Sequence, residues 1–251
     1  MKQKRKTSFQ RFVNGEITEA EETIVVESSM ELWLEDMHLA SFVCSPGYEK
    51  ELSLGYLLTS GIIETPSDIS FIEIELDRCV ITSERKSDFV TSFLLSKTNP
   101  EFIPKAVSYD INNIKPVNLD YLRESVKNLQ GGQHIHDETG ATHAALIQEI
   151  GTETAVIIED IGRHNAVDKV VGHIASLGTD LNRCMLLVTG RLTSELVGKA
   201  IGCNIPFMGS FTFATDMGIQ LAANADITLL GSLKRNEFWI YNQGKRAPFQ
   251  L

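Results

Sequence analysis

The sequence predicts a mixed α/β fold, in which a β-rich region precedes an α/β core. In the second half, apolar runs such as AVIIED and CMLLV alternate with stretches whose apolar residues recur at i, i+3, i+4 and i+7. This alternation indicates buried strands and amphipathic helices that follow one another, as in a sheet covered on both faces. Three prolines lie in a connector, 96–118, between the halves. We therefore divide the chain into a polar arm (1–22), a β-rich region (23–117) and an α/β core (118–251).

Most of the first half is predicted to form strands. Residues 1–22 are polar and charged, and we expect a loose arm there. TIVVES and the two apolar runs of MELWLEDMHLASFV, joined near Glu35–His38, indicate strands. KELSLGYLLTSGII instead carries leucines at helical spacing and ends its helix at Gly61. The segments ISFIEIEL, CVITSE and FVTSFLL return to strand character.

The second half is predicted as a regular succession of strands and helices. A helix starts at Leu119, where Asn118 can cap its first turn, and ends at Gly131. The apolar pattern then predicts the strands ATHAALIQEI, ETAVIIEDIG, CMLLVTG, IPFMGSF and DITLLGS. Helices are expected between these strands at 165–177, over TSELVGKAIG and around Asp216–Asn224.

Composition and charge exclude several classes of protein. Acidic residues outnumber basic ones by 33 to 23, which gives a net charge of −10, so a general nucleic-acid binder is not expected. No run of about 18 apolar residues predicts a membrane-spanning helix, and MKQKRK is not followed by the apolar segment of a secretory signal. We expect a cytoplasmic protein with reduced thiols. The four cysteines match no zinc or C-x-x-C spacing, so no metal is expected.

The segment EDIGRHNAVDKVVG is the strongest functional signal in the sequence. A buried strand ends in a turn at Gly162, and a helix then begins among Arg163, His164 and Lys169. A helix N-terminus offers free N–H groups and a partial positive charge, so this concentration of basic side chains predicts an anion site. Because the protein is acidic as a whole, a local cluster rather than the overall field must attract the anion.

Polar clusters follow two further strands of the predicted sheet. Ligands of open α/β sheets bind beyond the carboxyl ends of the strands. At such a place glycine lets the backbone approach a ligand closely, and arginine can bind phosphate with two parallel hydrogen bonds. Three such clusters predict an elongated, multiply charged ligand such as a nucleotide. His143, at the start of a strand, could face the same site as His164. The candidate binding residues are His143, Glu159, Asp160, Gly162, Arg163, His164, Lys169, Gly190, Arg191, Ser194, Glu195, Lys199, Lys234 and Arg235.

The same residues allow a purely structural interpretation. Asp160 with Arg163, and Glu195 with Lys199, could be ordinary surface ion pairs. Such features are common at helix starts, so both interpretations stay open for each residue. The other side chains with a structural alternative are Asn165 and Asp168 as a helix cap, Thr193 or Ser194 as another cap, His134 and His136 in a flexible loop, and His143 in the core.

The cysteines show no sign of an activated thiol. Cys184 lies inside an apolar strand and is expected in the core, and Cys79 belongs to a strand or hairpin. Cys203 follows a helix and is expected to be partly exposed, whereas Cys44 precedes a Ser-Pro-Gly turn. None has an adjacent base in the sequence that would lower the pKa of the thiol.

Taken together, these motifs resemble the FdhD/NarQ family of formate dehydrogenase accessory proteins. The similarity runs from about Cys44 to Tyr241 and includes CSPGYEKELSLGYLLTSGII, TGATHAALI, EDIGRHNAVDKVVG, TGRLTSELVGKA and ADITLLGSLKRNEFWIYN. It implies a cytidine-deaminase-like, three-layer α/β/α core and a homodimer. It also implies that the chain receives sulfur from a cysteine desulfurase and transfers it to a molybdenum bis(molybdopterin guanine dinucleotide) cofactor for formate dehydrogenase, with GDP-like nucleotides as mimics. The family's cofactor-binding segment corresponds to Ser232, Leu233, Lys234, Arg235, Asn236 and Glu237.

The sequence departs from this family where its members carry sulfur. The resemblance implies a C-x-x-C pair whose first cysteine holds a persulfide, but the corresponding residues, 82–102, contain no cysteine. Without a thiolate no persulfide forms there, so the catalytic residue is unidentified and enzymatic activity stays open. The alternatives are sulfur transfer through another cysteine and a cofactor-binding chaperone without transfer. A third hypothesis is a nucleotide-processing enzyme that uses His164 and Glu159, although the H-x-E and P-C-x-x-C signatures of zinc deaminases are absent.

Overall fold

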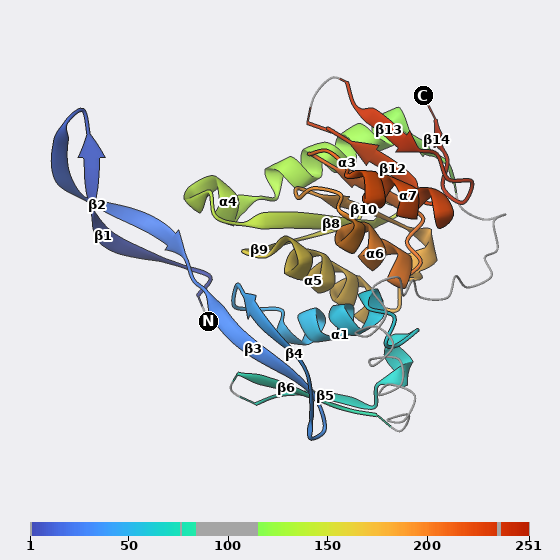
Figure 1. The fold of residues 1–251 in the computed structure, drawn as a ribbon, viewed down its shortest axis with the longest axis horizontal. Helices are drawn as coiled ribbons and strands as arrows, with labels where there is room; N and C mark the ends of the chain where they lie inside the picture. The colour runs from blue at the N-terminus through green and yellow to red at the C-terminus, as the bar shows by residue number, and fades with distance from the viewer. Residues whose placement is uncertain (1, 76, 84–114, 235–236, 251) are drawn as a thin grey trace.

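The centre of the molecule is a six-stranded mixed sheet (Figure 1). The computed structural model describes residues 2–75, 77–83, 115–234 and 237–250. In spatial order the strands of this sheet are β13 (Trp239–Asn242), β12 (Thr228–Gly231), β11 (Phe207–Ser210), β10 (Cys184–Val188), β8 (His143–Glu149) and β9 (Ala155–Asp160). Because β8 is antiparallel to both of its neighbours while β10, β11 and β12 are parallel, β9 to β12 all point the same way.

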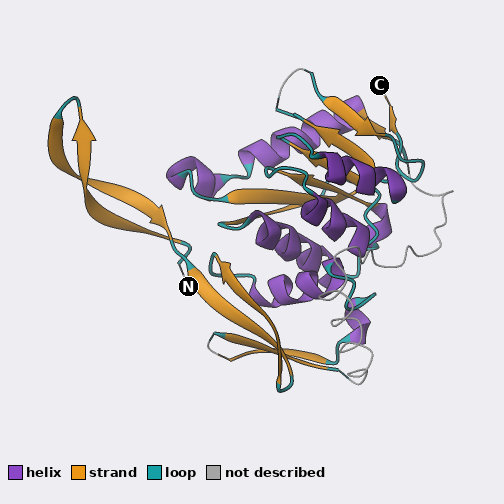
Figure 2. Ribbon diagram, in the orientation of Figure 1, coloured by secondary structure: helices purple, strands orange, loops and turns teal. Residues whose placement is uncertain are grey.

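Helices cover both faces of this sheet, which confirms the predicted α/β class (Figure 2). Leu122 and Leu129 belong to the apolar cluster on one face, and Val167 and Val171 belong to the cluster on the other. All four helices expected in this half are present, and Asn118 caps the first of them by accepting the Tyr121 N–H at 2.8 Å. The helices are α3 (Leu119–Gly131) on the first face, and α5 (Arg163–Ser176), α6 (Ser194–Gly202) and α7 (Asp216–Asn224) on the second.

A second, four-stranded sheet forms in the β-rich region. In spatial order its strands are β4 (Met37–Cys44), β3 (Ser28–Leu34), β6 (Arg78–Thr82) and β5 (Phe71–Glu75). α1 (Glu49–Thr59) packs between this sheet and α5, and one apolar cluster runs through them to the six-stranded sheet. The β-rich region and the α/β core therefore share interior packing. The expected strand FVTSFLL and most of the connector lie outside the described residues.

Glycines let α1 and α5 approach each other at backbone distance. A Cβ on Gly55 would overlap the carbonyl group of Asp168, and a Cβ on Gly172 would overlap that of Glu51. Neither carbonyl can yield without moving a whole helix, so a side chain at either position forces the two helices apart. This contact holds the turn after β4 against the start of α5, where the candidate site lies.

The expectation of a loose arm at 1–22 is wrong, because these residues form a long hairpin that projects from the body (Figure 1). β1 (Lys4–Val13) and β2 (Glu16–Val25) pair in antiparallel register over their full length. Asn14 and Gly15 connect them with φ of 52° and 93°, the left-handed conformations of a two-residue I′ turn. The Asn-Gly pair is the sequence signal for this turn, and the polar composition of the strands obscures it.

The segment that contains His134 and His136 is a short helix rather than the expected flexible loop. α4 (His134–Thr139) ends at Gly140, whose φ of 65° terminates it. Among the described residues, no helix is both long and apolar enough to cross a membrane. The remaining short elements are η1 (Pro66–Asp68), η3 (Leu181–Arg183), β7 (Val117–Asn118) and β14 (Phe249–Gln250).

Candidate functional site

The ends of five strands meet at one edge of the six-stranded sheet and form the candidate site. β9, β10, β11 and β12 end there and β8 begins there, because His143 pairs with Asp160 and Ala145 pairs with Val188. This is the edge at which open α/β sheets bind ligands. A hollow of about 270 Å³ opens beside it. The hollow is lined by Gln133, His136, Gly140, Ala141, Thr142, His143, Ile161, Thr189 and Lys234.

Arg163, the first residue of α5, supplies a cation next to this hollow. Its side chain runs across Gly190, where an added Cβ would lie 3.0 Å from Arg163 Cδ. Burial lowers the pKa of His143, which lines the hollow, and the charge of Arg163 lowers it further. The buried Nε of Arg163 has no hydrogen-bond partner among the described residues. Because an unsatisfied buried N–H group is costly, an anionic acceptor is expected at this position.

Two histidines lie within the field of Arg163, and both favour the neutral form. His143 Nδ1 lies 3.3 Å from Thr189 Oγ1, and His164 Nε2 lies 3.4 Å from Glu195 Oε2. Burial lowers the pKa of His143, and Arg163 adds to this effect. Burial also lowers the pKa of His164, followed by the charges of Lys199 and Arg163. A neutral imidazole keeps one N–H donor, and an approaching anion would favour its protonation.

These lowered pKa values predict how stability depends on pH. An unfolded histidine takes up its proton near pH 6.5, whereas the folded protein resists protonation of His143 and His164. In the ligand-free protein, the contribution of these two histidines to the free energy of unfolding is therefore fully present above about pH 6.5. It is lost as the pH drops from there toward the folded pKa values. Urea denaturation from about pH 8 to about pH 5 measures this fall. The variant His143→Gln/His164→Gln is expected to show a flatter profile, and an equally steep one contradicts the prediction.

Lys169 and Asp160, both predicted as ligand contacts, are instead an internal ion pair. Both side chains are fully buried, and Lys169 Nζ lies 2.7 Å from Asp160 Oδ2. The ammonium also donates to the Ser45 carbonyl at 2.7 Å. Asp160 accepts the N–H groups of Ser45 and Gly162 at 3.0 and 2.8 Å. We therefore correct their role: the pair joins the turn after β4 to the start of α5, and the N–H of Gly162 is used in the same network.

Glu159, another predicted contact, also serves the fold. Its carboxylate accepts the N–H groups of Ile135 and His136 and the hydroxyl of Thr142, each at 2.7 Å. Glu159 is buried, and it holds the start of α4 in place as a capping carboxylate does. These contacts position the wall of the hollow. They also occupy the carboxylate of Glu159, which argues against its use as the general base of a nucleotide-processing enzyme.

The predicted surface ion pairs form with other partners. Lys199 pairs with Asp168 at 2.8 Å, and Thr59 donates to the same carboxylate at 2.6 Å. Glu195 lies beside His164 rather than Lys199. The i,i+4 spacing within α6 favours Glu195–Lys199, but Asp168 is buried between α5 and α6 and offers a less solvated partner, where an ion pair is stronger. Asp168 is thus not a helix cap.

The remaining candidate residues differ in their relation to the hollow. Thr193, and not Ser194, caps α6 by accepting the Leu196 N–H at 3.4 Å, and Asn165 donates to Asp160 instead of capping α5. Lys234 lines the hollow, and Gly190 lies against Arg163. Of the other candidates, Ser232 and Leu233 are buried, whereas Arg191 and Glu237 are exposed. Arg235 and Asn236 lie outside the described residues.

Several lining residues have no strong signal in the sequence. Thr189 directly follows β10, and its hydroxyl lies 3.0 Å from the Ala144 N–H that donates to it. A threonine at the end of an apolar strand, as in CMLLVTG, is the only local sign of this position. Gln133 precedes α4, Thr142 precedes β8 and Ile161 follows β9, and all three line the hollow. In the sequence alone, these three residues look like ordinary loop residues.

All four cysteines are buried, which corrects the expected exposure of Cys203. Burial raises the pKa of the Cys44 thiol to about 11 and those of Cys184 and Cys203 to about 12. It also raises the pKa of Cys79. The thiolate is the nucleophilic form, so burial disfavours the reactive form of each thiol in this conformation. Within the part of the chain that the structure describes, no three His, Cys, Asp or Glu side chains gather to hold a metal ion.

The fold and the hollow define a mixed α/β protein with a candidate anion site at the strand ends of its sheet. A family model described as the FdhD/NarQ family matches residues 25–248, so the chain belongs to this family. Sulfur carrier protein FdhD of Bordetella petrii is 30% identical over 224 residues, which cover 82% of this chain and 80% of the relative. Sulfur carrier protein FdhD of Wolinella succinogenes is 29% identical over 246 residues, covering 93% and 85%.

A solved structure supports the same fold. It is described as a formate dehydrogenase accessory protein from Desulfotalea psychrophila and superimposes with a TM-score of 0.79. The match covers 98% of this chain and 100% of that one at 22% sequence identity. At this identity the likeness concerns the fold, and the function of the present chain must be argued from its site.

Proposed function

We propose that this chain is an accessory protein of formate dehydrogenase that binds a molybdenum bis(molybdopterin guanine dinucleotide) cofactor and transfers sulfur to it from a cysteine desulfurase. The names of the curated relatives support sulfur carriage, and the name of the solved structure supports the link to formate dehydrogenase. The observation that carries the binding half is the unpartnered Nε of Arg163 beside a hollow at the strand ends.

The chemistry of the hollow suits the pyrophosphate of such a cargo. Arg163 offers a fork of N–H donors that fits phosphate oxygens, and Lys234 offers a point charge on the rim of the hollow. His143 and Thr189 add neutral donors on its wall. GDP, which carries the same guanine and two phosphates, is the simplest mimic of this part of the cofactor.

A second function, binding without sulfur transfer, is favoured by the cysteines. Sulfur carriage needs a thiolate that a desulfurase can reach, yet all four thiols are buried and have raised pKa values. The residues at 82–102, where the family resemblance implies the carrier cysteine, contain none. A protein of this second kind would hold the cofactor and deliver it without chemistry of its own.

Thiol reactivity tests the sulfur-transfer half of the proposal. In the native protein alone, alkylation at neutral pH is expected to label the four cysteines slowly, because burial disfavours the thiolate. The urea-unfolded protein, as the matched control, should label all of them quickly. After incubation with a desulfurase and cysteine, cyanide treatment is expected to release thiocyanate, and one Cys→Ala variant should lose it. Release that equals the background of a variant with all four cysteines replaced contradicts transfer and leaves the binding function.

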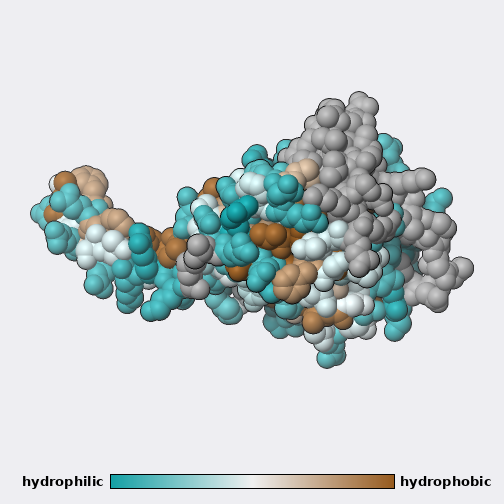
Figure 3. Space-filling view, turned by 90° about the horizontal axis from the view of Figure 1, so that it is seen from below, coloured by the Kyte–Doolittle hydropathy of each residue, from teal (hydrophilic) through white to brown (hydrophobic). Residues whose placement is uncertain are grey.

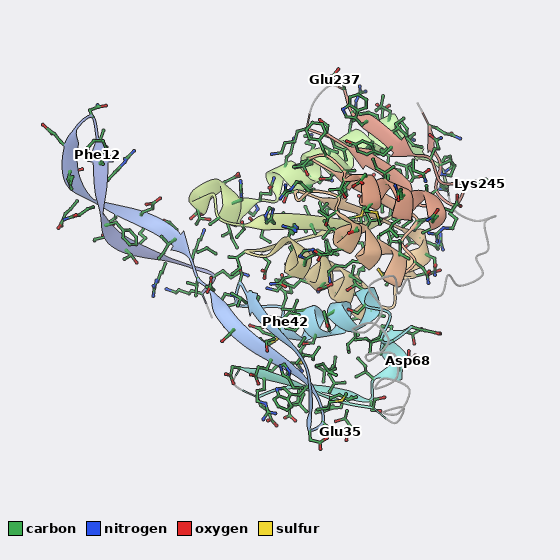
Figure 4. The ribbon with its side chains drawn as sticks, in the orientation of Figure 1. Phe12, Glu35, Phe42, Asp68, Glu237 and Lys245 are labelled. Atoms are coloured by element: carbon green, nitrogen blue, oxygen red, sulfur yellow. The ribbon has the colours of Figure 1, made fainter. Side chains whose placement is uncertain are left out.

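We also propose a second copy of this chain as a partner, joined through the projecting hairpin. Phe12 and Ile17 pair across its tip and are 72% and 67% exposed, and Figures 3 and 4 show the apolar tip and Phe12 on it. An isolated two-stranded hairpin is marginally stable in water, so this one is expected to gain order from a partner. Its strands are also complementary in charge: β1 carries Lys4, Arg5, Lys6 and Arg11, and β2 carries Glu16, Glu19, Glu21 and Glu22.

The oligomeric state tests the role of this hairpin. Replacing Phe12 and Ile17 with serine is expected to convert a dimer into a monomer, because the apolar surface at the tip is lost. Size-exclusion chromatography with light scattering gives the mass of each form. Phe71→Ser, which alters an exposed phenylalanine on β5 instead, should leave the dimer intact. A wild-type monomer, or a tip variant that stays dimeric, contradicts the proposal.

A further inference from the structure

The helix α4 forms one wall of the hollow, and it is too short to hold its place alone. Gln133 precedes this helix and His136 belongs to it, and both residues line the hollow. A helix of six residues has little stability of its own in water, and of its residues only Ile135 is buried. Glu159 fixes the start of the helix through the N–H groups of Ile135 and His136. The second turn, which carries the exposed Glu138, depends on a different support.

The projecting hairpin provides this support through its stem, which we define as residues 3–7 and 22–26. Of the described strands and helices, β2 is the one that α4 contacts most extensively. Next to this contact, Lys4 forms an ion pair with Glu138, and Gln3 Nε2 donates to the backbone of the turn after β4 at 2.9 Å. Figure 1 shows α4 on the side of the body from which the hairpin projects. The hairpin stem therefore joins α4 to the turn after β4.

Burial along the hairpin shows that the stem, and not the tip, rests on the body. Thr23, Ile24 and Val25 at the end of β2 are half-buried, whereas residues 16–19 at its start are exposed. The structure describes every residue of the hairpin stem, and none of them lines the hollow. The stem therefore acts on a ligand only through the elements that it supports, and α4 is the one of these that lines the hollow.

We propose that the hairpin stem is a positioning element of the anion site. Lys4 and Glu138 hold α4 against the stem, and this contact keeps Gln133 and His136 in place around the ligand. The inference rests on the proposed cofactor-binding function and adds residues that do not touch the ligand. A wall that is held before the ligand arrives loses less conformational entropy on binding. The coupling is reciprocal, so a ligand that orders α4 also stabilises the hairpin stem.

Exchanging the charges of the Lys4–Glu138 pair tests the inference, with calorimetric titration of the full chain with inorganic pyrophosphate. Lys4→Glu and Glu138→Lys are each expected to weaken binding about two- to fivefold, the scale of a partly exposed ion pair. The variant Lys4→Glu/Glu138→Lys should restore the wild-type affinity. The long-range field of the new charges acts differently, because it weakens anion binding in Lys4→Glu and strengthens it in Glu138→Lys. Lys6→Glu, which alters an exposed lysine of the same strand, is the matched control and should leave the affinity unchanged.

Hydrogen exchange gives a second readout, which does not depend on the affinity. Without ligand, the backbone amides of residues 134–139 are expected to exchange faster in either single variant than in wild type, because α4 has lost its support. The variant with both charges exchanged should return to the wild-type rate. Saturating pyrophosphate should slow exchange in the hairpin stem of the wild-type protein, although no stem residue lines the hollow.

The outcomes separate this inference from the function on which it rests. If wild-type protein binds pyrophosphate and both single variants bind it equally well, the stem has no positioning role and the anion site stands. Opposite effects of the two single variants, or an equal loss in Lys6→Glu, assign the effect to charge and also overturn the inference. The same holds if pyrophosphate leaves exchange in the stem unchanged. If wild-type protein does not bind pyrophosphate, the proposed cofactor-binding function fails, and the inference fails with it.

Discussion

Replacing Lys169 with methionine is expected to lower the free energy of unfolding by about 3–5 kcal/mol, because it leaves the carboxylate of Asp160 buried without its counter-charge. Both side chains are fully buried, and their 2.7 Å contact joins β9 to α5. The methionine is close to lysine in length, so packing changes little. Urea denaturation at neutral pH gives the change directly, provided that the slope of the transition stays constant.

Two variants make this prediction specific. Lys127→Met removes a lysine whose side chain is 76% exposed in a pair with Glu124, and it is expected to change stability by less than about 0.5 kcal/mol. Asp160→Asn combined with Lys169→Met removes both charges and should recover part of the loss. If the Lys169→Met protein is as stable as wild type but does not bind GDP, the prediction is contradicted, and Lys169 is a ligand contact rather than part of a stabilising ion pair.

Replacing Arg163 with alanine is expected to weaken GDP binding about 10- to 100-fold, while the free energy of unfolding without ligand changes little or rises. A charge-assisted hydrogen bond contributes roughly 1.5–3 kcal/mol, and Arg163 has a buried Nε without a partner among the described residues. Removing a group that is unsatisfied in the free protein relieves a cost rather than breaking a contact. Calorimetric titration and urea denaturation measure the two effects separately.

The controls for Arg163 distinguish geometry from charge. Arg163→Lys keeps the charge but loses the planar fork, so its affinity for GDP should fall between wild type and the alanine variant. Arg183→Ala removes an arginine that pairs with Glu149 at 3.3 Å, at the opposite edge of the sheet, and should leave binding unchanged. An Arg163→Ala protein with wild-type affinity, or an equal loss in Arg183→Ala, contradicts the position proposed for the anion.

The local pattern of the sequence predicted most elements of the fold. The helix caps at Asn118 and Thr193 and the turn at Gly162 could be anticipated because each depends on neighbours within a few residues along the chain. The hairpin at Asn14–Gly15 is local too, and its signal was present but outweighed by the polar composition of its strands. Apolar periodicity is local for the same reason, since it records which face of an element is buried.

The roles within EDIGRHNAVDKVVG show what the local pattern could not decide. Arg163 and Lys169 lie six residues apart on one helix, and both suit an anion by chemistry alone. The tertiary structure separates them, because Lys169 meets Asp160 and the Ser45 carbonyl in the interior, while Arg163 lies across Gly190 at the strand ends. Ser45 is 124 residues away from Lys169 in the sequence, so no local spacing could reveal this partner.

The sequence by itself thus determined the class of fold, the order of most elements of its α/β core and the presence of a basic cluster where a strand meets a helix. Only the tertiary structure decided which of those charges remain available to a ligand. The physical reason is that periodicity and capping are properties of one segment, whereas burial and the pairing of charges depend on what other segments bring to the same place. Cys203 illustrates the same limit: it follows a helix end, yet packing leaves it only 7% exposed.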